Sequence, residues 1–316
     1  MNTIVKQALR IGLTPANALQ GLADWRDNRR YPPPGQIVKV DGRDVHLVTS
    51  GMDQPGPTVV FESSEAGYSL DWQLVQPEVA AFAPVVAYDR PGFGWSDPPD
   101  RPMSGLQLVA NLREALRVAD IKPPYVLVGH SFGGMLVRLF AAHHTAHVAG
   151  YVVLDGLHRN DMNLEIDLNA PGERLSDEDK HSLDVLHMAG KAGMLRLLFE
   201  RGLPVYKRKV PDDLYKMYRA RFVSSNAVEA LISQLHALPE TLAQVSSQLS
   251  EPPEDLPSVT VRTEAGLQDP LDNQTEMEQT IFFGRMQTIQ WDRPHAVARA
   301  VRDVIGKIES QTQAAD

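Results

Sequence analysis

The sequence Gly-His-Ser-Phe-Gly at residues 129–133 constrains the fold more than any other part of the 316-residue chain. An apolar run rich in β-formers, Tyr125 to Val128, precedes it, and an apolar run of helical character, 135–142, follows it. A strand, a tight turn with glycine two positions before and after a serine, and a helix are the parts of a nucleophile elbow. The helix would point its first backbone N–H groups at an oxyanion formed beside the serine. We therefore expect Ser131 to be a nucleophile.

Strands and helices alternate on both sides of this turn. The predicted strands are Gln36–Val40, Val45–Thr49, Thr58–Phe61, Val85–Tyr88, the strand before the elbow, Gly150–Leu154, Ser258–Thr263 and Thr280–Phe283, and the predicted helices are Leu70–Phe82, Leu106–Ala119 and Pro294–Ile308. The first two strands form a hairpin. This alternation predicts an α/β protein with a mostly parallel, doubly wound sheet, in which ligands bind at the carboxyl ends of the strands.

The alternation stops between residues 157 and 256, where helices alone are predicted. They begin near Ser176, after Pro211, at Asn226 and at Leu238. A helical insertion between two strands of an open sheet would cover the strand ends as a lid. The expected organisation is a helical arm and linker at 1–34, a core at 35–156 and 257–312, and a lid at 157–256.

The N-terminal arm is predicted to contain two short helices. The second opens at Thr14-Pro15, which suits a cap and a first helical residue. Its apolar residues Ala16, Leu19, Leu22 and Trp25 share one face. We expect both helices to pack on the body, and a peripheral membrane contact or a docking arm is the alternative.

Composition excludes several classes of function. The 31 Lys and Arg residues against 40 Asp and Glu residues give a formal charge of −9, which gives no reason to expect nucleic acid as a partner. Without cysteine there is neither a disulfide nor a thiolate metal site. The N-terminal apolar positions are too interrupted for a leader or a spanning helix. We expect no metal, no cofactor, no integral membrane segment and a cytoplasmic location, with the oligomeric state open.

Three stretches together resemble the α/β-hydrolase fold superfamily, and within it a bacterial branch with a serine nucleophile. They are the elbow, the segment Asp89-Arg90-Pro91-Gly92-Phe93-Gly94-Trp95-Ser96 and the segment Gln290-Trp291-Asp292-Arg293-Pro294. The resemblance implies an α/β-hydrolase fold in which the serine is supported by a histidine base and a carboxylate.

The position of the base departs from this pattern. Aligned on the segment before the closing helix, Gln287 stands where relatives carry histidine. A primary amide can hold a substrate or a water molecule but cannot accept and return a proton. Met286 also departs from the expected glycine, which favours natural divergence over one engineered change. His158, three residues past Asp155 near the end of the strand that follows the elbow, is the candidate substitute.

For the acid, Asp155 ends the strand that follows the elbow, and Asp269 is the second candidate. The expected oxyanion hole combines the backbone N–H of Phe132 with one from the loop after Thr58–Phe61. Glu65 falls at or beside that second donor, where an anion would hinder acyl transfer unless the side chain is protonated or turned away to solvent. His130, next to the nucleophile, is expected to pack in the elbow or to contact substrate.

These residues predict an enzyme that acts at Ser131 on a small, apolar carbonyl compound: an ester, a lactone or a thioester. Since the usual histidine is missing, we expect weak hydrolysis or a non-hydrolytic lyase, isomerase or cyclase activity. Epoxide hydrolase and dehalogenase activity is disfavoured, because those relatives carry aspartate in place of Ser131. A catalytically inactive ligand-binding or scaffold protein of the same fold is the alternative.

Overall fold

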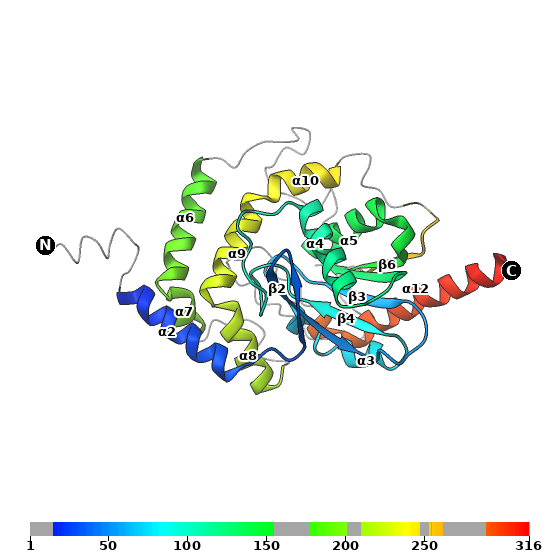
Figure 1. Ribbon diagram of the computed structural model, residues 1–316, viewed down its shortest axis with the longest axis horizontal. Helices are drawn as coiled ribbons and strands as arrows, with labels where there is room; N and C mark the ends of the chain where they lie inside the picture. Colours follow the sequence, from blue (N-terminus) through cyan, green and yellow to red (C-terminus); the bar gives the residue numbers. More distant parts are fainter. Residues whose placement is uncertain are drawn as a thin grey trace, which may run out of the picture.

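We analysed a computed structural model of the chain (Figure 1). It describes residues 15–154, 177–200, 210–246, 253, 255–261 and 289–315. Within these ranges no helix is both long enough and apolar enough to cross a membrane.

The centre of the molecule is a sheet whose described strands are arranged in the order β1-β2-β4-β3-β5-β6-β7 (Figure 1). Their bounds are β1 Gln36–Val40, β2 Arg43–Ser50, β3 Thr58–Glu62, β4 Val85–Tyr88, β5 Tyr125–His130, β6 Val148–Leu154 and β7 Ser258–Val261. Strands β1, β2 and β4 pair antiparallel, whereas β4, β3, β5, β6 and β7 pair parallel. The predicted α/β class and mostly parallel sheet are confirmed. The predicted strand Thr280–Phe283 lies outside the described residues.

Each face of the sheet is covered by helices because successive strand residues point to opposite sides. Val60 and Leu127 pack with helices α4 (Gly105–Val118) and α5 (Phe132–His143). Val59 and Val126 pack with α3 (Gln76–Ala80) and α12 (Pro294–Ala315). Apolar residues at consecutive positions of the central strands therefore serve two cores, which explains why these strands read as unbroken apolar runs.

Several predicted helix boundaries are wrong. The closing helix expected at Pro294–Ile308 is α12, which continues to Ala315. The helix expected at Leu70–Phe82 is a 3₁₀ turn, η1 (Ser69–Trp72), followed by the short α3. Pro77 explains the break, since proline suits the first turn of a helix but not its interior. The helix expected to open at Asn226 is α9 (Ser225–His236), and its cap is Ser224, whose Oγ accepts a hydrogen bond from the Ala227 backbone N–H.

Helices follow one another along the chain between β6 and β7, in the region expected to be a lid. They are α6 (Asp177–Lys191), α7 (Met194–Glu200), α8 (Asp212–Phe222), α9 and α10 (Leu238–Ser246). In Figure 1, α6 to α9 lie beyond one end of the sheet, together with α2 (Pro15–Arg30). Hydrogen bonds join this group to the loop after β3: the Tyr68 hydroxyl donates to the Tyr218 carbonyl over 2.6 Å, and Gln234 Nε2 donates to the Glu65 carbonyl over 2.8 Å.

The arm helix α2 begins at the predicted Pro15, but its expected orientation is wrong. Leu19, Leu22 and Trp25 are 68%, 61% and 57% exposed, whereas Gln20 and Asp27 are buried against the body. Polar contacts to the helices inserted between β6 and β7 hold α2 in this orientation. The periodicity of the α2 sequence alone does not reveal these contacts. The helix expected before α2 lies outside the described residues.

Candidate active site

The turn at Ser131 has the backbone geometry of a nucleophile elbow. Ser131 has φ 51° and ψ −115°, a conformation that residues with a side chain rarely adopt. A Cβ atom on Gly129 would collide with the Gly133 backbone, and one on Gly133 would lie 2.5 Å from the Ser63 carbonyl oxygen. Glycine is therefore required at both positions, because the turn crosses against the loop that follows β3.

Phe132, the expected oxyanion donor, is the first residue of α5. The first backbone N–H groups of a helix have no carbonyl partner within the helix, and they lie at its positive end. The Phe132 N–H is thus available beside Ser131 for a negatively charged oxygen.

Glu65 turns its carboxylate toward Ser131. Ser131 Oγ donates a hydrogen bond to Glu65 Oε2 over 3.2 Å, and both residues are half-buried. Among the described residues this is the hydrogen-bond partner of the serine hydroxyl. The sequence places Glu65 at or beside an oxyanion donor, and the structure places its carboxylate within reach of the proton that Ser131 carries.

Arg90 holds the loop that carries Glu65. Its Nη1 lies 2.5 Å from Glu62 Oε1 and donates to the Ser63 carbonyl over 2.7 Å, and its Nη2 donates to the Ser64 carbonyl and, over 3.2 Å, to the Glu65 carbonyl. Arg90 is 1% exposed. One buried guanidinium therefore fixes three successive carbonyls at the end of β3.

Two aromatic rings pack near the Arg90 guanidinium. Its carbon lies 5.4 Å from the ring centroids of Phe93 and Phe132, which suits a cation–π contact to each. Because Phe132 carries the expected oxyanion donor and Glu65 faces Ser131, Arg90 contacts both sides of the candidate site.

The carboxyl group of Glu62, the last residue of β3 before this loop, is strongly desolvated. Burial raises the pKa of Glu62 above its ordinary value, although the charge of Arg90 and the hydroxyl of Tyr88 act in the opposite direction. Tyr88 donates to Glu62 Oε2, and burial raises the pKa of that phenol well above its ordinary value. The hydroxyl thus keeps its proton as a donor.

Asp71 is a second buried acid beside the loop. Burial raises its pKa to about 7, against the opposing effect of hydrogen bonds from Tyr218 and from the Tyr68 backbone. A Cβ atom added to Gly67 would collide with Asp71 Oδ2, so the carboxyl group packs directly on the turn that follows Glu65. Nothing in the sequence distinguishes this aspartate from an ordinary residue of a helical stretch.

His130 is 3% exposed, and burial lowers its pKa to about 4. Neither ring nitrogen has a hydrogen-bond partner within the described part of the chain. At neutral pH the ring is therefore uncharged, which suits a packing role in the elbow better than proton transfer.

Four predicted site residues lie outside the described residues: Asp155, His158, Asp269 and Gln287. The acid and the missing histidine base therefore stay predictions. The last described residue before the first of these gaps, Leu154, accepts a hydrogen bond from the Ser131 backbone N–H over 3.0 Å.

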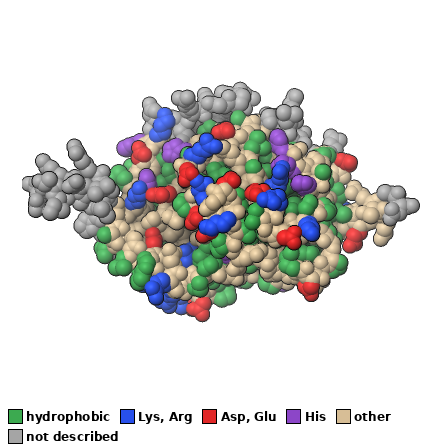
Figure 2. All heavy atoms as spheres, viewed as in Figure 1, with side chains coloured by type: hydrophobic (Ala, Val, Ile, Leu, Met, Phe, Trp, Pro, Cys, Tyr) green, Lys and Arg blue, Asp and Glu red, His purple; other side chains and the backbone are tan. Residues whose placement is uncertain are grey.

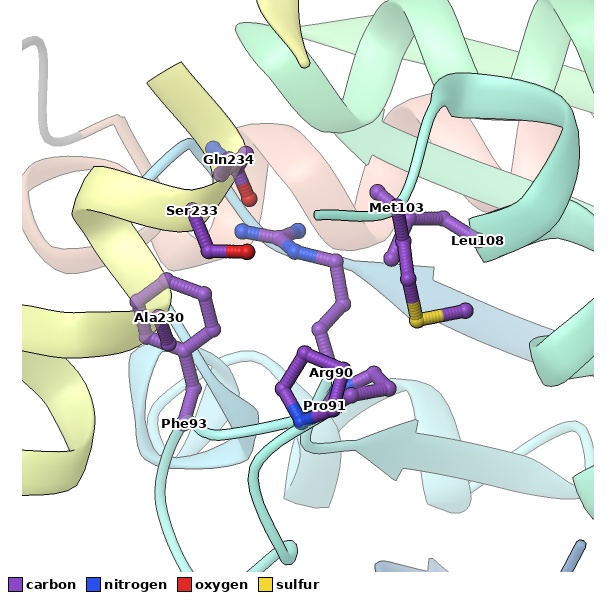
Figure 3. Close-up of a pocket in the computed structure, with 9 residues that line it drawn as sticks. Arg90, Pro91, Phe93, Met103, Leu108, Ala230, Ser233 and Gln234 are labelled. Atoms are coloured by element: carbon purple, nitrogen blue, oxygen red, sulfur yellow. The ribbon is translucent and has the colours of Figure 1, made fainter. Parts of the chain in front are cut away.

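A shallow hollow, partly open to solvent, lies beside the site between α9 and the segment after β4 (Figure 3). Arg90, Phe93, Met103 and Gln234 are among its lining residues, and Ser131 is not. Its walls include the two side chains that hold the Glu65 carbonyl, so it adjoins the support of the loop rather than the nucleophile.

Sequence reasoning missed the residues that support the site, namely Glu62, Asp71, Gln234 and the role of Arg90. The available signal was a set of charged residues at the ends of apolar strands, Glu62 after β3 and Asp89-Arg90 after β4. Charges at such positions must be paired when they are buried. Among the described residues, no group of three or more His, Asp or Glu side chains is arranged to hold a metal ion.

Comparisons with known proteins show the family and the fold. A model of the alpha/beta hydrolase family matches residues 56–304. An uncharacterised protein of Schizosaccharomyces pombe is 39% identical over 105 residues, which is 33% of this chain but only 19% of that protein. A putative epoxide hydrolase from Pseudomonas aeruginosa superposes with a TM-score of 0.62 at 15% identity, covering 88% of this chain and 97% of the other. The enol-lactonase from Burkholderia xenovorans LB400 superposes with a TM-score of 0.59 at 16% identity, covering 86% and 100%. Structural likeness at such identity shows the fold alone.

Proposed function

Because the chain belongs to the α/β hydrolase family, we propose that it is an enzyme that acts at Ser131 on a small, apolar carbonyl compound, an ester, a lactone or a thioester. We further propose that its hydrolytic activity is weak and that its main reaction is a non-hydrolytic proton transfer of the lyase, isomerase or cyclase type. The observation that carries this proposal is the hydrogen bond from Ser131 Oγ to the Glu65 carboxylate.

The Ser131–Glu65 pair is poorly suited to hydrolysis. A carboxylate is a weaker base than an imidazole for the proton of a serine hydroxyl. An anion beside the Phe132 N–H also opposes the negative charge of a tetrahedral intermediate. Gln287, at the expected position of the histidine, has no useful basicity.

The same pair suits removal of a proton from the carbon next to a carbonyl group. In this reaction Glu65 takes the proton, and the electron pair of the broken C–H bond moves onto the carbonyl oxygen. When substrate binds, the Ser131 hydroxyl turns from Glu65 to that oxygen, and it and the Phe132 N–H donate hydrogen bonds to it. Glu65 then returns the proton to a different carbon. Alternatively, the electron pair returns from the oxygen to expel a leaving group from the next carbon, and Glu65 gives its proton to that group. Arg90 and Gln234 support the proposal because they fix the Glu65 backbone in place.

The test combines two readouts on the wild type, Ser131→Ala, Glu65→Gln and, as a control, the exposed Glu114→Gln. Intact mass after a fluorophosphonate probe and hydrolysis of short p-nitrophenyl esters measure nucleophile activation, and we expect little of either. Exchange of the α-protons of small lactones and thioesters in D₂O, followed by NMR, measures proton transfer. We expect exchange in the wild type and the control, and its loss in Glu65→Gln.

The second candidate is a ligand-binding protein without turnover, and the half-buried carboxylate against the nucleophile also suits it. Absence of both exchange and labelling, together with binding of the same lactones in calorimetry, would favour this candidate. Rapid labelling of Ser131 with fast ester turnover would instead mean that a histidine outside the described residues activates the serine.

A further inference from the structure

Helix α2 turns its polar face inward and its apolar face outward. Surface helices of globular proteins show the opposite arrangement, since apolar side chains are stabilised by leaving water. Leu19, Leu22 and Trp25 stand at spacings of three residues and are each more than half exposed, while Gln20 is 3% and Asp27 5% exposed.

The buried polar face is tied to the inserted helices. Arg196 of α7 donates to Asp24 over 2.9 Å and to Asp27 over 2.6 Å. The Ser225 hydroxyl donates to Asp24 over 2.7 Å, and Gln20 Nε2 donates to the Val223 carbonyl over 2.9 Å. Hydrogen bonds and ion pairs to the polar face of α2 therefore keep its apolar face turned outward. Rotation of α2 about its axis would break them.

The helices packed near α2 also expose large apolar side chains. They are Val185 and Met188 on α6, at 53% and 73%, and Met194 and Leu197 on α7, at 52% and 46%. Helix α6 packs against both α2 and α7. Most of the large apolar residues that the described chain exposes are thus on three neighbouring helices at one end of the molecule.

The charges on the open face of α2 are all positive. Arg26, Arg29 and Arg30 are exposed, whereas both acids of the helix face the body. The Arg29 guanidinium lies 5.1 Å from the ring centroid of Trp25. In Figure 2, hydrophobic and basic side chains gather at the lower left of the view, where Figure 1 places α2.

We propose that the exposed face of α2, with the apolar residues of α6 and α7 beside it, docks on an anionic lipid surface. Exposed tryptophan and leucine next to arginine on one helix face match the boundary between headgroups and acyl chains. A second copy is the poorer occupant, because a two-fold contact through α2 would bring two sets of arginines together with no exposed acid on that helix to pair with them. On α6 the exposed Asp184 lies next to Val185. An anionic lipid surface supplies the missing charge. Because the whole protein has a net charge of −9, we expect only this end, with its exposed arginines, to be attracted to an anionic surface.

The test is co-sedimentation of the full-length protein with vesicles of phosphatidylcholine alone or with one quarter phosphatidylglycerol. We expect binding to the anionic vesicles and its loss at high salt. Leu22→Gln should weaken binding about tenfold, and Arg29→Gln about fivefold. The control is Met52→Gln, which replaces an apolar side chain that is 48% exposed on the core and should change nothing.

Tryptophan fluorescence gives an independent readout, since Trp72 and Trp291 are buried, Trp95 is half-buried and Trp25 is exposed. The emission should shift to shorter wavelength when anionic vesicles are added, and not in Trp25→Phe. Equal sedimentation of wild type and Leu22→Gln would overturn the proposal. So would a dimer in light scattering that Leu22→Gln dissociates, or tight binding only after deletion of residues 2–14, which would identify that segment as the occupant.

Discussion

Arg90 and Glu62 form an ion pair, with 2.5 Å between Nη1 and Oε1, in which each side chain is no more than 2% exposed. The pair joins the ends of β4 and β3 and supports the loop that brings Glu65 to Ser131. Removal of one partner of a buried pair leaves the other charge desolvated without compensation.

We therefore expect Arg90→Met to lower the free energy of unfolding by about 3–5 kcal/mol in urea denaturation. Arg117→Met is the matched control, because Arg117 pairs with Glu114 on the exposed side of α4 and solvent screens that pair. Equal stability of the two variants would mean that the buried pair contributes nothing to the fold.

The stability of the protein should depend on pH through Asp71. Its pKa is raised from 3.8 to about 7 in the folded state, so between these values the folded state binds more protons than the unfolded chain. Stability contributed by the protonated acid is complete below pH 3.8 and is lost as the pH rises to about 7. Asp71→Asn should remove this loss and raise the melting temperature at pH 8, whereas the exposed Asp53→Asn should not.

His130 should change the pH dependence of stability in the opposite direction to Asp71. Its pKa falls from 6.5 to about 4 on folding, so the unfolded chain binds more protons between these values and stability falls as the pH drops from 6.5 to 4. The two slopes oppose each other in the wild type over this window. Thermal melts of Asp71→Asn should therefore show a steeper loss of stability toward pH 4 than the wild type, and parallel curves would contradict the assignment.

The sequence predicts the elbow well because its constraints are local. A strand, a serine flanked by glycines and a helix determine one turn, and contacts at Gly129 and Gly133 explain why no other residue fits. Glu65 is different. Its distance from the end of β3 places it near the oxyanion side, but its backbone is held by Arg90, after β4, and by Gln234 of α9.

The face of α2 shows the same limit. Periodicity shows that Leu19, Leu22 and Trp25 share one face of the helix. Since the apolar face of a surface helix usually packs against the core, this face would be expected to be buried. The outcome is reversed because Arg196 and Ser225, far along the chain, pair with the polar side of the helix. A pattern within one helix shows which residues share a face, and only contacts between distant segments decide which face is buried.

Glu65 should limit any attempt to restore hydrolysis. If Gln287 occupies the position of the base, Gln287→His supplies a proton acceptor but leaves the carboxylate beside the oxyanion. We expect little gain in p-nitrophenyl ester turnover from Gln287→His alone, and a further gain of more than about tenfold when Glu65→Gln is added. Glu65→Gln alone, which has no base, is the control. A large gain from the single histidine would show that Glu65 does not obstruct the site.

Backbone strain at Ser131 should lower the free energy of unfolding of the wild type, and a substitution that relieves the strain should raise it. Its φ of 51° with ψ of −115° is a conformation that costs about 1–3 kcal/mol for a residue with a side chain and much less for glycine. Ser131→Gly should therefore unfold at higher urea concentration than the wild type, while Ser131→Ala, which keeps the Cβ atom, should gain less. Both variants lose the hydrogen bond to Glu65, so their difference isolates the backbone contribution. If Ser131→Gly is no more stable than Ser131→Ala, the turn is not strained, and its conformation is then no evidence that selection has kept Ser131 for chemistry.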